Sequence, residues 1–181
     1  MMRLSNTLYQ KAKTIKLLVL DVDGVLTDGG LYINDSGQEC RRFNTLDGQG
    51  IKLLRQSGVE TAVISGGQSK AVTSRMQILG VKYIYQNSTD KLSVFKTLLQ
   101  KLKLNAQQTA YMGDDVLDLP VMKQAGLSIA VANAHALIKE HADTQTACTG
   151  GNGAVREVCD LIMKAQQTYE AQIAPYLKNP M

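Results

Sequence analysis

The sequence lacks tryptophan altogether, and aromatic residues account for only 5% of its 181 positions. We therefore expect no aromatic platform of the kind on which single-stranded nucleic acids stack. The basic residues form no run typical of a patch that binds nucleic acid or a membrane surface. The formal net charge of +4 instead suits an anionic small molecule. We predict neither a nucleic-acid nor a membrane partner.

Cysteines and long apolar runs are also scarce. Cys40, Cys148 and Cys159 are odd in number and show no CxxC spacing, which favours free thiols in a reducing compartment. The first residues lack the apolar stretch and cleavage site of a signal peptide. No apolar run approaches the roughly 20 residues of a membrane-spanning helix. We expect a soluble, cytoplasmic protein.

What the sequence does contain is a globular composition, with 44% hydrophobic and 20% charged residues. Its length suits a single domain over residues 1–181. Short apolar runs alternate with longer helical patterns, which is typical of an α/β domain with a doubly wound parallel sheet. The expected strands are Ile15–Leu20, Thr61–Ile64, Lys82–Tyr85, Ala110–Met112 and Leu127–Val131. The expected helices are Gln49–Ser57, Gln68–Leu79, Lys91–Leu102, Val116–Ala125 and Ala154–Tyr169.

Two segments depart from this alternation. Residues 29–43 contain the turn-forming residues Asp35, Ser36 and Gly37 between two short apolar runs, so we expect a small β-hairpin inserted after the first strand as a cap. Residues 171–181 contain Pro175 and Pro180. Because proline disrupts a helix interior, we predict a C-terminal tail that does not extend a regular helix far and is either frayed or docked on another surface.

The most informative motif follows the first expected strand directly. Asp21, Asp23 and Gly24 form a DxDG sequence at the carboxyl end of that strand, where open α/β sheets bind their ligands. Gly24 allows the backbone to turn sharply. Two carboxylates this close repel each other, and a divalent cation would relieve the repulsion while one of them attacks a phosphorus atom.

A second acidic cluster follows the fourth expected strand. It places Asp114, Asp115 and Asp118 at the same edge of the sheet. Carboxylate oxygens of this kind favour Mg²⁺. Either acidic cluster alone is also consistent with an ordinary helix N-terminus, where acidic residues complement the helix dipole. Two clusters, each ending a buried strand, favour a metal site.

The remaining chemistry-bearing residues lie between these clusters. Ser65, Gly66 and Gly67 follow the second strand and offer a hydroxyl and backbone N–H groups to an anion. Lys91 follows the third strand. Read alone, these are an ordinary turn and a solvated lysine. In this order, the carboxylate pair, hydroxyl, lysine and acidic cluster supply a nucleophile, a phosphate cradle, a cation and a metal site, as phosphoryl transfer requires.

This ordered set resembles the phosphatases of the haloacid dehalogenase superfamily. The resemblance implies that Asp21 is the nucleophile and that Asp23 is the general acid and base. It implies a Mg²⁺ ion held by Asp21, the backbone carbonyl of Asp23, and Asp114. Ser65 and Lys91 would bind the phosphoryl oxygens, and Asp115 and Asp118 would support the site.

Residues 21–29, 43–54, 74–81, 110–122 and 150–162 further resemble the small bacterial members of that superfamily that hydrolyse 3-deoxy-D-manno-octulosonate 8-phosphate in lipopolysaccharide synthesis. Those members have only a hairpin as a cap and form homotetramers in which a neighbouring subunit closes each active site. The substrate contacts implied by this resemblance are Asn44, Thr45, Leu46, Asp47, Gly48, Lys52, Gly66, Arg75 and Lys91.

The chain departs from the resemblance at Leu46 and Gly67, where arginine is common and would suit a carboxylate-bearing sugar acid. One alternative is a phosphatase for another sugar-acid phosphate, such as a sialic-acid 9-phosphate. Another is a non-catalytic receiver-like module, although the DxDG spacing fits it poorly. By pattern alone Asp47 is a helix N-cap, and residues 150–153 are interpreted as a mobile loop.

Overall fold

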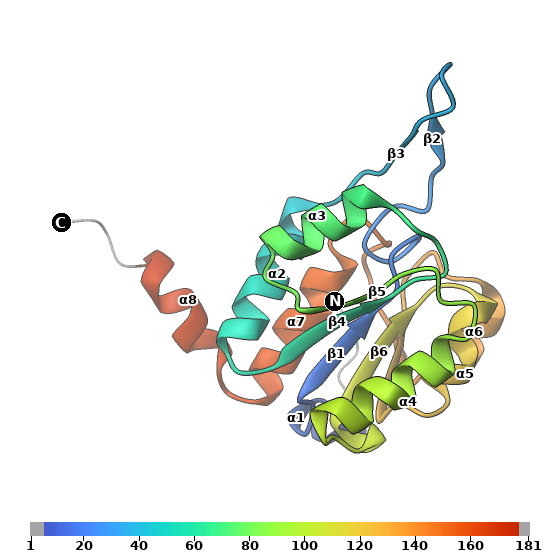
Figure 1. Ribbon diagram of the computed structural model, residues 1–181. Coiled ribbons are helices and arrows are strands. Elements are labelled where there is room, and N and C mark those ends of the chain that lie inside the picture. The colour runs from blue at the N-terminus through green and yellow to red at the C-terminus, as the bar shows by residue number, and fades with distance from the viewer. Residues whose placement is uncertain (1–5, 178–181) are drawn as a thin grey trace.

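A computed structural model describes residues 6–177 of the chain. Its centre is a six-stranded sheet in the order β5-β4-β1-β6-β7-β8, and every neighbouring pair is parallel (Figure 1). The strands are β1 (Leu17–Leu20), β4 (Glu60–Ile64), β5 (Tyr83–Tyr85), β6 (Thr109–Gly113), β7 (Leu127–Ala130) and β8 (Thr144–Gln145). The predicted α/β class with a doubly wound parallel sheet is confirmed.

Helices cover both faces of this sheet. On one face α2 (Thr45–Gln56) and α1 (Asn6–Lys13) pack against α7 (Ala154–Ala165). On the other, α5 (Leu119–Met122) packs against α4 (Lys91–Leu102) and α6 (Ala136–His141) (Figure 1). The remaining helical segments are α3 (Lys70–Ile78), α8 (Tyr169–Leu177) and the 3₁₀ turns Ala106–Gln108 and Val116–Asp118. Because both faces are covered, β1, β6 and β7 are buried at every position, which explains their continuous apolar sequences.

The predicted hairpin is present between β1 and α2. It consists of β2 (Tyr32–Ile33) and β3 (Glu39–Cys40), which pair antiparallel and project from the body of the molecule (Figure 1). Asn34 holds the turn, since its side-chain oxygen accepts hydrogen bonds from the N–H groups of Ser36 and Gln38. Gly37 has a φ of 75°, in the left-handed region that glycine tolerates best.

The helix boundaries differ from the predictions in several places. The helix expected from Gln49 begins at Thr45, because Asn44 rather than Asp47 is its N-cap. The segment expected as one helix over Val116–Ala125 is a 3₁₀ turn followed by the short α5. The helix expected over Ala154–Tyr169 ends at Ala165, and Gln167 then adopts a φ of 60°. Residues 6–13 and 136–141 form helices that the sequence analysis did not predict.

The prediction of a tail that does not extend a helix far is wrong for its described part. Helix α8 continues through Pro175 to Leu177. Ile173 packs against the core, and the Gln49 side chain donates a hydrogen bond to the hydroxyl of Tyr176 at 3.0 Å. Residues 178–181 of the predicted tail lie outside the described part of the chain. No helix within residues 6–177 combines the length and apolar character needed to cross a bilayer.

Candidate active site

A pocket of about 320 Å³ lies at the carboxyl ends of the central parallel strands. Asp21 follows β1, Ser65 follows β4 and Asp114 follows β6, so the sheet itself brings these three side chains together. The other residues that line the pocket are Asp23, Gly29, Gly66, Gly67, Lys91, Asp115, Leu117 and Asp118. The pocket therefore gathers every residue that the sequence analysis placed in catalysis or metal binding.

The turn after Asp21 depends on the absence of side chains at two glycines. Gly24 has a φ of 86°, and a Cβ atom there would overlap the carboxylate of Asp114. A Cβ atom on Gly150 would overlap the carbonyl oxygen of Gly24. Gly151 donates its N–H to the carbonyl of Val25 at 2.9 Å. The loop at residues 150–153 thus packs against the turn after Asp21, and its three glycines are buried. The sequence analysis interpreted this segment as a mobile loop.

Lys91 bridges the two acidic motifs. Its Nζ lies 2.9 Å from Oδ1 of Asp21 and 2.7 Å from Oδ1 of Asp118, and the lysine side chain is buried. Asp118 has partners at both oxygens, because Oδ1 also accepts from the Tyr111 hydroxyl and Oδ2 accepts from the N–H of Asp114. Its carboxylate packs on Gly113, where any side chain would collide with it. Asp118 therefore holds Lys91 and the start of the second acidic motif in place.

The surroundings of the pocket disfavour the ionised form of two of its carboxyl groups, Asp21 and Asp114. Burial, together with the nearby charge of Asp118, raises the pKa of Asp21 to about 8, although Lys91 opposes the shift. Burial and the charges of Asp118 and Asp115 raise the pKa of Asp114 to about 7. The ionised carboxylates of the pocket thus carry more negative charge than Lys91 neutralises.

A divalent cation fits this arrangement. Asp21, Asp114 and Asp118 each offer a carboxylate oxygen, and these oxygens lie within 4.8 Å of one another. Oxygen ligands of this kind suit Mg²⁺. Because Asp118 already bonds to Lys91 and Tyr111, Asp21 and Asp114 are the carboxylates best placed to contact an ion directly. The sequence analysis had named Asp21, Asp114 and the backbone carbonyl of Asp23.

Arg41 is a site residue that the sequence analysis missed. It follows the hairpin strand β3, and its Nε donates to Oδ1 of Asp23 at 2.9 Å. A Cβ atom on Gly67 would lie 3.8 Å from Nη2 of Arg41, which places the guanidinium at the rim of the pocket. No local pattern distinguishes Arg41 from the adjacent Arg42. Only the folding back of the hairpin brings Arg41 to Asp23.

The predicted substrate contacts divide into separate groups. Gly66 and Lys91 line the pocket, as does Ser65. Asn44 caps α2 and also donates to the carbonyl of Gly151. Arg75 lies over Gly48, which leaves room for it, and its Nη2 donates to the carbonyl of Asn44. Asn44, Gly48 and Arg75 thus cluster at the start of α2, outside the pocket lining.

The other predicted contacts lie elsewhere. Thr45 and Leu46 are exposed in the first turn of α2. Lys52 lines a different cavity, with Arg55, Gln56 and Leu79. Asp47 is buried, and its carboxylate accepts from the N–H groups of Gly153 and Arg156 at the start of α7. Asp47 is therefore neither the cap of its own helix nor open to a ligand, because it caps α7 from the neighbouring helix.

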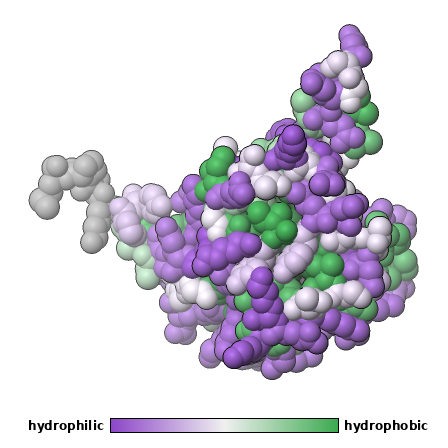
Figure 2. Space-filling view, in the orientation of Figure 1, coloured by the Kyte–Doolittle hydropathy of each residue, from purple (hydrophilic) through white to green (hydrophobic). Residues whose placement is uncertain are grey.

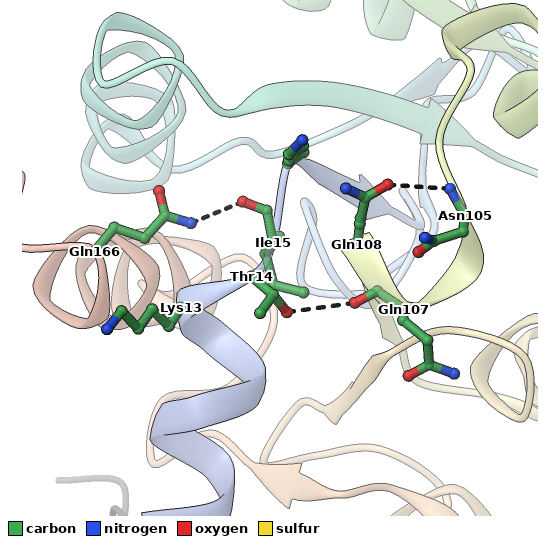
Figure 3. Close-up of a pocket in the computed structure, with 8 residues that line it drawn as sticks. Lys13, Thr14, Ile15, Asn105, Gln107, Gln108 and Gln166 are labelled. Carbon is green, nitrogen blue, oxygen red and sulfur yellow. Dashed lines mark hydrogen bonds between the residues drawn. The ribbon is translucent and has the colours of Figure 1, made fainter.

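A roomier cavity, of about 620 Å³, lies at the amino ends of β1 and β6 (Figure 3). Its lining carries Lys13, Lys16 and several amide side chains but no carboxylate. Gln166 donates to the carbonyl of Ile15, and Thr14 to that of Gln107, so these polar groups hold neighbouring segments together (Figure 3). The volume of a cavity is therefore not what identifies the candidate active site, because the roomier cavity lies at the opposite edge of the sheet.

Comparisons with other proteins show the family to which the chain is related. A model of the haloacid dehalogenase-like hydrolase family matches residues 59–158. The 3-deoxy-D-manno-octulosonate 8-phosphate phosphatase of Escherichia coli strain K12 is 49% identical over 156 residues, which are 86% of this chain and 83% of that protein.

Two solved structures are also similar. A probable phosphatase from Pseudomonas syringae pv. phaseolica is 50% identical, covering 97% of this chain and 100% of that one with a TM-score of 0.95. A 3-deoxy-D-manno-octulosonate 8-phosphate phosphatase from Moraxella catarrhalis, in complex with magnesium, phosphate and KDO, is 44% identical, covering 96% and 99% with a TM-score of 0.93. The chain belongs to the haloacid dehalogenase-like hydrolase family.

Proposed function

We propose that this protein is a Mg²⁺-dependent phosphatase that releases phosphate from 3-deoxy-D-manno-octulosonate 8-phosphate. The observation that carries the proposal is the convergence of Asp21, Asp23, Ser65, Lys91 and Asp114 at one sheet edge. It is supported by the E. coli and M. catarrhalis relatives, which carry that substrate in their names and match this chain over most of its length.

The first chemical step forms a covalent phosphoryl-enzyme. An oxygen of Asp21 attacks the phosphorus, and the bond between phosphorus and the sugar oxygen breaks. Asp23, two residues further along the turn, donates a proton to the departing alcohol. Lys91, 2.9 Å from Asp21, orients the nucleophile and balances the charge of the phosphoryl oxygens. Ser65 offers its hydroxyl, and Gly66 its backbone N–H, to the same oxygens.

The second step regenerates the enzyme. Asp23, now without its proton, removes one from a water molecule. The water oxygen attacks the phosphorus, the bond to Asp21 breaks, and inorganic phosphate leaves. Bound Mg²⁺, held by Asp21, Asp114 and the carbonyl of Asp23, would neutralise the charge on the phosphoryl oxygens. Asp118 and Asp115 keep this part of the site in position.

A phosphatase for another sugar-acid phosphate, such as a sialic-acid 9-phosphate, is a second candidate. It is prompted by Gly67 and by Leu46, which is 58% exposed, because both depart from the arginines that are common at these positions in the octulosonate 8-phosphate members. Among the residues that the resemblance suggested for substrate binding, Asn44, Thr45, Gly48, Lys52 and Arg75 lie outside the pocket lining of one subunit. We propose that they contact substrate only in an assembled enzyme.

We further propose a homotetramer in which a neighbouring subunit closes each site. The exposed apolar residues Leu31, Tyr32 and Ile33 on the hairpin support it, and Figure 2 shows hydrophobic surface on that projecting element. Exposed Leu117 at the pocket supports it too. We place the enzyme in the cytoplasm, as a single domain acting in lipopolysaccharide precursor synthesis. The free state of Cys40, Cys148 and Cys159 is consistent with a reducing compartment.

A substrate panel tests the proposal. Phosphate release would be measured at saturating Mg²⁺ with 3-deoxy-D-manno-octulosonate 8-phosphate, a sialic-acid 9-phosphate and p-nitrophenyl phosphate. We expect the highest kcat/KM for the octulosonate. A preference for the sialic-acid ester would select the second candidate, and no turnover of any ester would contradict a phosphatase and favour a receiver-like module.

A further inference from the structure

Arg41 has donor capacity that the fold does not use. Its side chain is only 11% exposed, with Nε on Asp23 and Nη1 at 3.4 Å from Glu39. Within residues 6–177, the hydrogen bond of the Arg41 side chain comes from Nε, and Nη2 donates none. A planar guanidinium whose orientation is fixed at one nitrogen and open at another is well suited to binding a carboxylate.

The position of Arg41 relative to Asp23 indicates which part of a substrate it would meet. Asp23 must reach the oxygen of the departing alcohol to protonate it. Lys91 contacts Asp21, on the side where the phosphoryl group is attacked. Arg41 contacts Asp23, and it makes no ion pair with Asp21 in the described part of the chain. It therefore lies on the side of the leaving sugar.

Gly67 leaves space beside this guanidinium. A Cβ atom there would lie 3.5 Å from Oδ2 of Asp23 and 3.8 Å from Nη2 of Arg41, both ordinary contact distances. A residue with a side chain is thus sterically allowed at position 67, yet the chain has none. The volume next to Nη2 stays open to a ligand instead of being filled by the protein.

We infer that Arg41 is a specificity-determining residue that binds the carboxylate of a sugar-acid phosphate while Asp23 serves the leaving oxygen. This inference rests on the proposed phosphatase function and deepens it. Arg41, at the base of the hairpin, would supply the positive charge that arginines commonly provide at the positions of Leu46 and Gly67. Arg41 also accounts for acid-sugar selectivity without any change in the phosphate-binding residues Ser65 and Lys91.

The test compares two substrates in each variant. The test uses the ratio of kcat/KM for 3-deoxy-D-manno-octulosonate 8-phosphate to that for D-arabinose 5-phosphate. Because the arabinose ester lacks the three-carbon unit that bears the carboxylate, this ratio reports recognition of that unit separately from recognition of the phosphate. We expect Arg41→Gln to lower this ratio roughly 10- to 100-fold, as for the loss of a charged hydrogen bond. Arg42→Gln is the matched control, since Arg42 binds Asn152 and lies near Asp28, and it should keep the ratio.

A second variant moves the positive charge of Arg41 to position 67. The double variant Arg41→Gln with Gly67→Arg brings a guanidinium to the same space from the loop after β4 rather than from the hairpin, and it should recover at least part of the ratio. Inhibition by inorganic phosphate should be unchanged in Arg41→Gln, because Ser65 and Lys91 remain.

The outcomes separate this inference from the proposed function. If the unmodified enzyme does not favour the octulosonate ester, the proposed function fails. If it does favour that ester but Arg41→Gln slows both substrates equally, or weakens phosphate inhibition, Arg41 acts through Asp23 or the phosphate and the inference is wrong.

Discussion

At the scale of single residues, the site is defined by charge that the protein does not balance by itself. Asp21 and Asp114 have pKa values raised to about 8 and about 7, chiefly because Asp21 is buried, Asp114 is half-buried and both face the carboxylate of Asp118. Lys91 is one cation against three carboxylates. Such crowding is typical of functional sites, where a bound cation or substrate group offsets the repulsion between the carboxylates.

This crowding predicts how stability depends on pH. A carboxylate whose pKa is raised in the folded state stabilises the fold fully below its unfolded pKa of about 4, and that contribution is lost as pH rises through the folded pKa. Each group can lower the free energy of unfolding by up to ~1.4 kcal/mol per pH unit in this window. In EDTA, the Tm should therefore fall between about pH 5 and pH 8.

Magnesium should reverse this loss. Because the ion binds ionised carboxylates, it should raise the Tm more at about pH 8 than at about pH 6. Asp21→Asn is the control, since it removes one of the repelling charges and should flatten the pH dependence in EDTA. A Tm that is independent of both pH and Mg²⁺ would show that the crowded carboxylates are not a metal site.

The sequence predicted these residues because each one follows a strand. Asp21, Ser65 and Asp114 stand directly after β1, β4 and β6, and parallel strands bring such positions together without further information. Arg41 could not be predicted in this way. Its place depends on the path of the hairpin, which is set by long-range contacts rather than by local pattern.

At the scale of elements, the catalytic turn is held by contacts from distant parts of the chain. Asp47 of α2 caps α7 through the N–H groups of Gly153 and Arg156, and this contact fixes the loop that carries Gly150 under Gly24. Asn44 adds a bond to Gly151 of the same loop. Sequence reasoning took Asp47 for a local cap, because a cap supplied by another helix leaves no trace in residue spacing.

We predict that Asp47→Ala is a stability variant and not a binding variant. It leaves two backbone N–H groups of α7 without an acceptor, so the free energy of unfolding should fall by ~2–4 kcal/mol. At a temperature where the variant remains folded, its KM should stay within a factor of about two. Urea denaturation and steady-state kinetics measure the two effects.

The exposed Glu140, on α6, provides the comparison. Glu140→Ala should change the free energy of unfolding by no more than about 0.5 kcal/mol. An Asp47→Ala protein of normal stability with a strongly raised KM would instead assign Asp47 to the substrate, as the family resemblance implied.

At the scale of the whole molecule, the most unusual feature is the hairpin. Leu31 is 75% exposed and Ile33 is 59% exposed on an element that stands away from the body (Figures 1 and 2). Exposed apolar residues gathered in one place are typical of an interface. The sequence predicted that the hairpin exists, from its turn residues, but could not predict that no segment within residues 6–177 covers its apolar side chains.

We predict that the double variant Leu31→Asp with Ile33→Asp dissociates the enzyme. The unmodified protein should have a mass near four times 19.7 kDa by light scattering, and the variant should have the mass of one chain. Ile78→Asp, at an exposed apolar residue on α3, should retain the larger mass. A monomeric unmodified protein, or an unchanged mass for the double variant, would contradict the shared-site tetramer.

The central claim is that Asp21 is the nucleophile of a phosphatase, and Asp21→Asn tests it most directly. Asparagine preserves the shape of the side chain but removes the anionic oxygen that attacks phosphorus. Phosphate release from 3-deoxy-D-manno-octulosonate 8-phosphate in Mg²⁺ should fall at least ~10³-fold, while the circular dichroism spectrum stays unchanged. Release at the unmodified rate would contradict the account.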